Sequence, residues 1–245
     1  MSINCYQAVV LAAGRSRRIG IPYSKVFLPY KKRPLIIYLL KKLLKIKEIE
    51  KIIVVLNEEG IREAKERYQD FFSNKKILII CQEEPKGTGD AFLKALPYLK
   101  EEDKVIVLCG DTPLIKKETI ERMIRLYEKE KPGIILLTAF LRNPTGYGRI
   151  FRNKKREILA IVEEKNASPK IKRIKEVNSG CYLFDLGVVN NLISEIKENS
   201  LTKEYYLTDL IELAIKKEIK LRGIRTSGKE IKGINTYKEY LSLKK

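Results

Sequence analysis

Two hydrophobic patterns alternate along the first 140 residues of this chain. Short apolar runs of strand length occupy residues 7–13, 52–56, 77–81, 105–108 and 134–141. Between them, segments with one apolar face predict helices at residues 34–45, 60–71, 90–96 and 118–130. Because strands that alternate with helices form a parallel sheet through right-handed crossovers, this pattern predicts an α/β fold with a doubly wound, mostly parallel sheet.

The pattern changes in the second half of the chain. A turn at residues 144–148 leads into short runs at 149–151 and 158–162, which predict a β-hairpin rather than another strand and helix. The remaining predicted segments are a charged connection at 171–176, a strand at 178–184, helices at 188–197 and 207–217, a strand at 221–224 and a final helix from Thr236. We expect the hairpin to form a small lid over the first half.

Composition restricts the class of protein. Of the 245 residues, 44% are apolar and 33% are charged, as expected for a folded globular chain. Apolar runs are too short for a membrane span and the N-terminus lacks a signal-peptide pattern, so we expect a cytoplasmic protein with no membrane partner. The abundance of Lys, Ile and Glu is similar to the bias of proteins from hot environments.

The formal net charge of +19 suggests nucleic-acid binding, because lysine and arginine neutralise phosphates. The distribution of this charge argues against that function. Basic residues are spread along the chain and interleaved with Glu, as in residues 41–51 and 118–131, which is typical of solvated helix faces. We therefore expect no nucleic-acid partner.

The four cysteines, Cys5, Cys81, Cys109 and Cys181, form no close pair and lie in or beside apolar runs. The chain contains no histidine, so a zinc site is not expected. We interpret the four cysteines as reduced core residues.

The loop after the first predicted strand carries the first candidate chemistry. Gly14 lets the backbone turn sharply and approach a ligand, and Arg15, Arg17, Arg18 and Lys25 place four cations within eleven residues. Such a loop suits a polyanion. The alternative is a tight turn followed by a solvated basic face.

Polar residues also follow the third predicted strand. Gln82 comes directly after it, and Gly87 and Thr88 lie in a turn at the start of a predicted helix. The free N–H groups of a helix N-terminus can bind an anion or the edge of a base. Alternatively, Thr88 only caps the helix.

Asp111 follows the fourth predicted strand. A carboxylate at that end of a central strand lies in the crevice where open α/β sheets bind ligands. It can hold Mg²⁺ together with substrate phosphates. The alternative is a cap for the turn at Pro113 or for the helix near Glu118.

Further short motifs occur along the chain, and their order and spacing can be compared with those of known families. The whole series is residues 11–14, Lys25, Gln82 with 87–88, residues 110–114, 146–150, 162–165, 178–180, 204–209 and 233–235. In these motifs, over nearly its whole length, the chain resembles the sugar-phosphate nucleotidyltransferases, and among them the uridyltransferase domain of the bacterial bifunctional N-acetylglucosamine-1-phosphate uridyltransferase/glucosamine-1-phosphate acetyltransferases.

The resemblance implies a Rossmann-like fold and a single domain over residues 1–245. It places a nucleotide-binding half at about 1–140, a sugar-binding half at about 141–235 and a C-terminal helix at 236–245. It implies transfer of a uridylyl group from UTP to N-acetylglucosamine 1-phosphate by in-line attack on the α-phosphate, assisted by Mg²⁺ and by Lys and Arg side chains, for the synthesis of a cell-envelope precursor.

The resemblance also implies residue roles. The catalytic cations are Arg18 and Lys25. The nucleotide-binding positions are Leu11, Ala12, Ala13, Gly14, Gln82, Gly87 and Thr88. The sugar-binding positions are Cys109, Gly110, Gly148, Glu163 and Asn178, and the Mg²⁺ ligands are Asp111 and Asn235. Simpler roles stay open, since Asn178 suits a cap at the start of its strand, Glu163 a surface carboxylate, and Asn235 the cap of the last helix.

The chain departs from the family pattern at three places. Ser16 and Arg17 replace a Gly and a Thr of the family's first loop, in which respect the loop is similar to molybdopterin cytidylyltransferases. Cys109 stands where the bacterial enzyme has Tyr. The sequence stops at Lys245 without hexapeptide repeats, so we expect no acetyltransferase activity, and a monomer or weak homo-oligomer.

Two other functions fit the same motifs. One is a nucleotidyltransferase that uses CTP, dTTP or GTP, or a different sugar 1-phosphate. The other is a regulator that binds a nucleotide sugar without catalysis. The presence of Lys25, Asp111 and Asn235 argues against the regulator.

Overall fold

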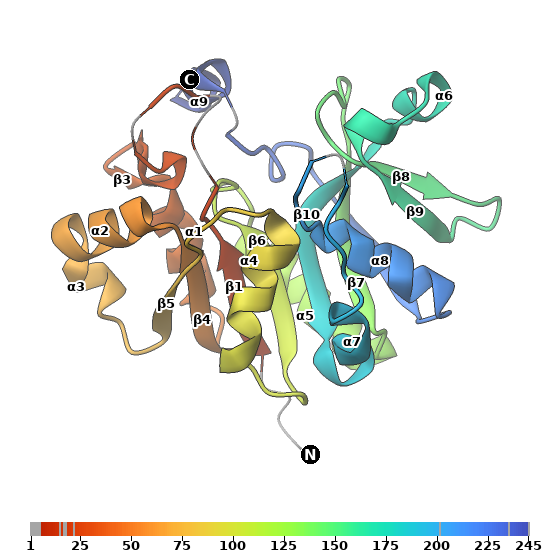
Figure 1. The fold of residues 1–245 in the computed structure, drawn as a ribbon, viewed down its shortest axis with the longest axis horizontal. Coiled ribbons are helices and arrows are strands. Elements are labelled where there is room, and N and C mark those ends of the chain that lie inside the picture. The colour runs from red at the N-terminus through yellow and green to blue at the C-terminus, as the bar shows by residue number, and fades with distance from the viewer. Residues whose placement is uncertain are drawn as a thin grey trace.

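The computed structural model describes residues 6–14, 16, 19–21, 23–200, 202–234 and 236–244. Its centre is a twisted sheet with helices packed on both faces (Figure 1). Among the described helices, none is long and apolar enough to cross a bilayer.

Nine strands of the described residues form one sheet. They are β1 (Tyr6–Leu11), β4 (Ile49–Leu56), β5 (Ile77–Cys81), β6 (Lys104–Cys109), β7 (Ile134–Phe140), β8 (Arg149–Arg152), β9 (Ile158–Val162), β10 (Glu176–Asp185) and β11 (Leu221–Thr226). A separate small hairpin pairs β2 (Pro29–Tyr30) with β3 (Arg33–Pro34).

The helices mostly follow strands. Their bounds are α1 (Leu35–Leu43), α2 (Glu58–Arg67), α3 (Gln69–Phe72), α4 (Thr88–Ala95), α5 (Lys117–Glu130), α6 (Pro169–Lys172), α7 (Leu186–Ile193), α8 (Leu207–Lys216) and α9 (Tyr237–Lys244).

The strand order β11-β7-β10-β6-β1-β4-β5 confirms the mostly parallel sheet. β1 pairs in parallel with β4 and β6, β4 with β5, and β11 with β7. β10 runs antiparallel between β6 and β7. The carboxyl ends of β1, β5 and β6 therefore meet at one edge of the sheet, where open α/β sheets bind ligands.

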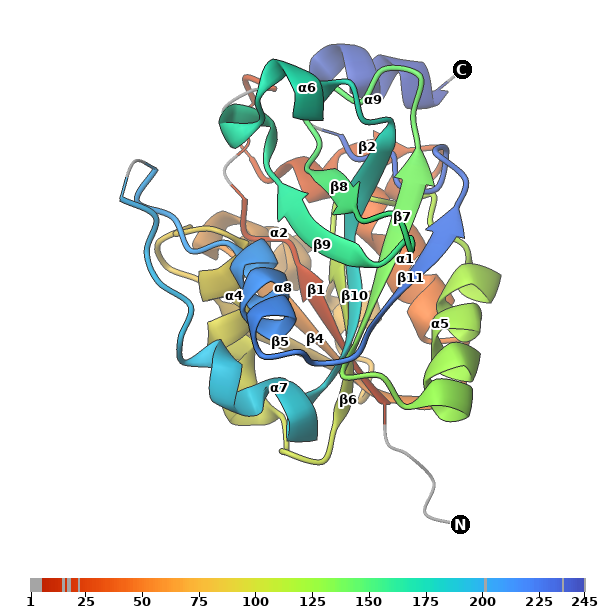
Figure 2. The same cartoon turned by 90° about the vertical axis from the view of Figure 1, so that its right-hand side faces the viewer.

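Side chains of the central strands alternate between two apolar clusters, as the period of a strand requires. In β1, Ala8 and Val10 pack with α1 and α5 on one face, whereas Val9 and Leu11 pack with α4, α7 and α8 on the other. Figure 2 shows these two groups of helices on opposite sides of the sheet. The doubly wound arrangement predicted from the apolar runs is confirmed.

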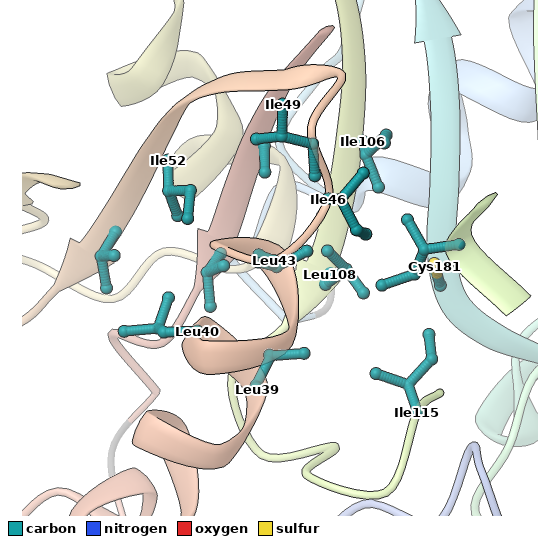
Figure 3. Close-up of a cluster of buried hydrophobic side chains, with 14 of the residues drawn as sticks. Leu39, Leu40, Leu43, Ile46, Ile49, Ile52, Ile106, Leu108, Ile115 and Cys181 are labelled. Carbon is teal, nitrogen blue, oxygen red and sulfur yellow. The ribbon is translucent and has the colours of Figure 1, made fainter. Parts of the chain in front are cut away.

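Helix α1 supplies much of the first cluster. Figure 3 shows Leu39, Leu40 and Leu43 beside Ile106 and Leu108 of β6, and all five side chains are fully buried. Each such side chain stabilises the fold by about 1.5–3 kcal/mol through the removal of apolar surface from water.

Three local expectations need correction. The helix expected at 60–71 is divided into α2 and α3, because Tyr68 leaves the helical conformation and its ring stacks on Phe27 at 5.9 Å. α4 begins at Thr88, two residues earlier than expected, with Gly87 as its N-cap. The segment expected as a charged connection overlaps α6, which Ser168 caps by accepting a hydrogen bond from the Ile171 N–H.

The expected hairpin is present as β8 and β9. Arg149 pairs with Val162, and it also pairs with Val177 of β10, which joins the hairpin to the main sheet. The hairpin packs against α8. Gly148, just before β8, and Glu163, just after β9, both line a cavity at the ligand edge of the sheet.

Candidate active site

A cavity of about 840 Å³ opens at the carboxyl ends of β1, β5 and β6. It brings together most of the residues that the sequence singles out, namely Leu11, Ala12, Ala13, Gly14, Lys25, Gln82, Gly87, Thr88, Cys109, Asp111, Gly148, Glu163 and Asn178. Arg18 and Asn235, together with Arg15 and Arg17, lie outside the described residues. Their roles stay predictions.

Gly110 does not line the cavity but joins two of its loops. Its N–H donates to the Leu11 carbonyl at 2.8 Å, and a Cβ on Gly110 would lie 2.7 Å from the Cβ of Ala12. Only glycine permits this approach without a shift of the backbone. The close packing holds Asp111 next to the loop after β1, while contact of Gly110 with a sugar stays a prediction.

Lys25 begins a 3-10 helix, Lys25–Phe27, and both ends of the residue are held. Its backbone N–H donates to the Ser16 hydroxyl at 2.7 Å, and its ammonium group contacts Asp111 Oδ2. The side chains of Lys25 and Asp111 are 16% and 14% exposed. Ser16, a departure from the family pattern, therefore helps to position the lysine.

The loop before α4 is fixed to a distant segment of the chain. Gly89 donates to the carbonyl of Tyr205 at 2.8 Å, and the hydroxyl of Thr88 accepts from the Leu207 N–H at 3.1 Å. Gly87 has φ +99°, and a Cβ there would lie 2.4 Å from the Tyr205 carbonyl oxygen. The Thr88 side chain thus bonds to the first residue of α8, while Gly87 provides the cap of α4.

Gln82 lies beneath this loop and is 2% exposed. Its amide nitrogen donates to Asp90 Oδ2 at 2.5 Å and to the Gly87 carbonyl at 3.2 Å. The loop geometry and the Gln82 side chain are therefore coupled.

On the opposite side of the cavity, Glu163 and Asn178 form a polar group. Burial raises the pKa of Glu163, and a hydrogen bond from Thr208 at 3.2 Å partly opposes the shift. Asn178 donates to the Tyr182 hydroxyl at 2.6 Å, and its backbone N–H donates to the Gly148 carbonyl at 2.8 Å. These contacts orient both side chains at the wall of the cavity.

The cysteines divide between core and cavity. Cys181 is buried in the first apolar cluster, as expected, and Cys109 lines the cavity with its thiol 3.7 Å from the Gly180 carbonyl. Burial raises the pKa of the Cys109 thiol to about 12, so this group is protonated at neutral pH and unsuited to nucleophilic attack. Cys81, Cys109 and Cys181 form no disulfide, and Cys5 lies outside the described residues.

Comparison with known proteins gives the same picture as the geometry. Residues 7–229 match the model of the family described as Nucleotidyl transferase. The chain belongs to this family.

Nucleotidyl transferase relatives with high similarity carry the name Bifunctional protein GlmU. The protein of Acetivibrio thermocellus is 37% identical over 95% of this chain and 50% of its own length. That of Clostridioides difficile is 35% identical over 94% of this chain and 49% of its own length. The chain thus spans about half the length of the curated relatives it matches.

Among solved structures, a putative glucose-1-phosphate thymidylyltransferase from Bacillus anthracis, in complex with a sucrose, has the same fold. Its TM-score is 0.78 at 22% identity, with 98% of this chain and 94% of that chain covered. The Rossmann-like nucleotidyl transferase fold is confirmed.

The donor chemistry of this nucleotidyl transferase site fits Mg²⁺. Asp111 offers carboxylate oxygens inside the cavity, and Mg²⁺ is usually held by one or two such groups plus substrate phosphates and water. The described residues contain no group of three or more acidic, Cys or His side chains that would form a complete protein cage. Substrate phosphates would supply further ligands to an ion held by Asp111.

Two residues of the motifs at 146–150 and 162–165, Arg149 and Glu164, have supporting roles that the sequence does not predict. Arg149 is 1% exposed, and its guanidinium donates to the Tyr147 carbonyl and to Glu164 at 2.6 Å. Glu164 also accepts from the Gly146 N–H at 3.2 Å, and the hydrogen bond from Arg149 lowers its pKa. These contacts hold the turn before β8. Alternation within the hairpin gave no sign of them, because they depend on pairing across the turn.

Proposed function

We propose that this chain transfers the uridylyl group of UTP to N-acetylglucosamine 1-phosphate and releases pyrophosphate. One observation carries the proposal: Lys25 and Asp111 stand in contact within a cavity that also holds Gln82 on one side and Glu163 with Asn178 on the other. The Lys25–Asp111 pair can bind phosphates, and the two sets of polar side chains on either side of it can bind a base and a sugar. This arrangement suits a reaction that joins a nucleotide to a sugar through phosphates.

The proposed reaction needs positioning and charge neutralisation rather than a protein nucleophile. A phosphate oxygen of the sugar phosphate attacks the α-phosphorus of UTP, and the bond from that phosphorus to the bridging oxygen of the leaving pyrophosphate breaks. Because the attacking oxygen is already anionic, no general base is required. This agrees with a chain that has no histidine and with a Cys109 thiol held protonated.

Lys25 and the N–H groups of the loop at Ala13 and Gly14 are proposed to stabilise the negative charge of the transferred phosphoryl group. All three residues line the cavity, and preorganised donors of this kind act most strongly where charge develops. Arg18 is proposed as a second cation for the triphosphate. Asp111, with Asn235, would hold Mg²⁺, which when bound supplies further neutralisation of phosphate charge.

Base and sugar are assigned to opposite sides of the cavity. Gln82 and the N–H groups at Gly87 and Thr88 offer hydrogen bonds to the edge of a base, whereas Glu163 and Asn178 offer them to an N-acetylhexosamine. The order of motifs shared with the uridyltransferase domain supports UTP. The runner-up nucleotide is dTTP, because thymine carries the same hydrogen-bonding edge as uracil.

A substrate panel tests the proposal. UTP, dTTP, CTP and GTP are each combined with N-acetylglucosamine 1-phosphate and with glucose 1-phosphate, and pyrophosphate release is measured. We expect UTP with N-acetylglucosamine 1-phosphate to give the highest kcat/KM. A higher value for any other pair, or no release from any pair, would contradict the proposal. Asp111→Asn should abolish the activity, and Asp70→Asn, which changes an exposed carboxylate on α3, should not.

A further inference from the structure

The hydrogen bond from Gln82 to Asp90 determines which end of the Gln82 amide faces the cavity. Gln82 Nε2 lies 2.5 Å from Asp90 Oδ2 and 3.2 Å from the carbonyl oxygen of Gly87. Both partners are acceptors. A flipped amide would set its own carbonyl oxygen against a carboxylate and a carbonyl, which is electrostatically unfavourable. The orientation with the nitrogen toward Asp90 is therefore fixed by chemistry.

The other end of the amide remains available to a ligand. Among the described residues, none donates to Gln82 Oε1, and this oxygen is not sealed off from solvent. Gln82 lines the cavity, although the residue as a whole is only 2% exposed. Asp90 does not line the cavity, so it acts on a ligand only through Gln82.

We propose that Asp90 is a positioning residue that presents Gln82 Oε1 as an acceptor and so makes the cavity select a pyrimidine with a hydrogen on N3. Uracil and thymine donate from N3, whereas cytosine accepts there. The N–H groups at Gly87 and Thr88 complement the O4 atom of uracil, since the first N–H groups of a helix have no partner within it, whereas the next one, that of Gly89, donates to Tyr205. The 4-amino group of cytosine would face those donors instead. This inference rests on the proposal that the cavity binds a nucleoside triphosphate.

The negative charge of Asp90 is what makes the selection strong. An asparagine at position 90 can accept from the Gln82 amide or donate to it, so residue 90 would no longer distinguish the two orientations of the amide. The Gly87 carbonyl alone would then favour the original orientation. Because hydrogen bonds to charged groups are stronger than neutral ones, most of the preference comes from the carboxylate.

Equilibrium binding of nucleotides tests whether Gln82 Oε1 acts as the acceptor. Binding to the protein is measured by isothermal titration calorimetry with Mg²⁺ present and no sugar phosphate. The probes are UTP, CTP, N3-methyl-UTP, which lacks the N3 hydrogen, and 5-methyl-UTP, which keeps it. We expect CTP and N3-methyl-UTP to bind at least about tenfold more weakly than UTP, and 5-methyl-UTP to bind within about threefold of UTP. Equal binding of UTP and CTP, or binding of neither, would overturn the inference.

Two variants test the role of Asp90 itself. Asp90→Asn should reduce the UTP preference over CTP at least about fivefold, with folding checked by circular dichroism. Asp90→Ser carries the same expectation if the asparagine variant does not fold. Glu83→Gln is the matched control, because it removes a charge from an exposed position of the same loop that does not line the cavity, and its preference should equal that of the wild type. An unchanged preference in a folded Asp90 variant would overturn the inference.

The outcomes separate this inference from the proposed function. A wild-type protein that prefers UTP in binding but releases no pyrophosphate with any sugar 1-phosphate supports the role of Asp90 and contradicts the proposed transfer. Equal kcat/KM values with UTP and CTP in a working transferase contradict the role of Asp90 alone.

Discussion

The ammonium group of Lys25 contacts the carboxylate of Asp111 inside the cavity, although the two residues are 86 positions apart in the sequence. The parallel pairing of Leu11 with Cys109, at the ends of β1 and β6, brings their loops together. The cation proposed for the phosphates thus stands beside the carboxylate proposed for Mg²⁺. Each charge compensates the other in the folded chain.

A double-mutant cycle on this pair separates stability from activity. Lys25→Met and Asp111→Asn should each lower the free energy of unfolding by about 1–3 kcal/mol, because each removes one member of a partly buried ion pair. The double variant should be more stable than the sum of the two losses predicts. Urea denaturation measures the stabilities, and pyrophosphate release should be lost in all three variants. Strictly additive losses would show that the contact contributes nothing.

Metal removal gives a second prediction. EDTA should abolish pyrophosphate release, and added Mg²⁺ should restore it, because Mg²⁺ bound at Asp111 would neutralise part of the phosphate charge. Asp111→Asn should stay inactive at every Mg²⁺ concentration, whereas Asp70→Asn should show the wild-type requirement. Full activity in EDTA would show that the reaction does not need Mg²⁺.

The raised pKa of Glu163 leads to a third prediction, on stability and activity together. A buried carboxyl with a raised pKa costs stability once it ionises, so this cost appears as pH rises from the ordinary carboxyl pKa through the raised value. Glu163→Gln removes the ionisation. Its Tm should therefore match the wild type near about pH 4 and exceed it near about pH 8.

The same substitution should weaken sugar binding. We expect Glu163→Gln to raise the KM for N-acetylglucosamine 1-phosphate about tenfold, because a charge-assisted hydrogen bond is replaced by a neutral one, with a smaller effect on the KM for UTP. Glu66→Gln, which changes an exposed carboxyl of α2, is the control for both measurements. A Tm difference that is constant with pH, or an unchanged KM, would refute the assignment.

The loop before α4 gives a fourth prediction. Gly87 and Gly146 both have positive φ, but a Cβ on Gly87 would meet the Tyr205 carbonyl at 2.4 Å, whereas no described atom lies within 4 Å of a Cβ on Gly146. Gly146→Ala should therefore cost only backbone strain, about 1–2 kcal/mol of unfolding free energy. Gly87→Ala should cost about 1–2 kcal/mol more and weaken UTP binding. Equal losses would exclude the steric contact.

Much of the fold was accessible to sequence because local patterns determine it. The apolar run of β1, alternating along the chain with helices such as α1 and α5 that have one apolar face, predicts the doubly wound sheet. Asp111 is correctly predicted to follow β6. The antiparallel position of β10 between β6 and β7 was not accessible, because an apolar strand has no local mark of its direction.

For the site, the sequence predicts individual residues but not the contacts between them. The sequence indicates Lys25 and Asp111 separately, and their contact depends on the packing of Gly110 against Ala12. The sequence does not single out Asp90, because its link to Gln82 arises from the turn at Gly87. Such couplings follow from tertiary geometry rather than from residue type or spacing.

Isotope tracing of the two ends of UTP tests the central claim most directly. The wild-type protein is incubated with N-acetylglucosamine 1-phosphate, Mg²⁺ and UTP labelled with ³²P on either the α- or the γ-phosphate, and the products are separated. Uridylyl transfer predicts that the α-label appears in UDP-N-acetylglucosamine and the γ-label in pyrophosphate, in equal amounts. Release of γ-label as inorganic phosphate, or absence of α-label from any sugar nucleotide, would contradict the account.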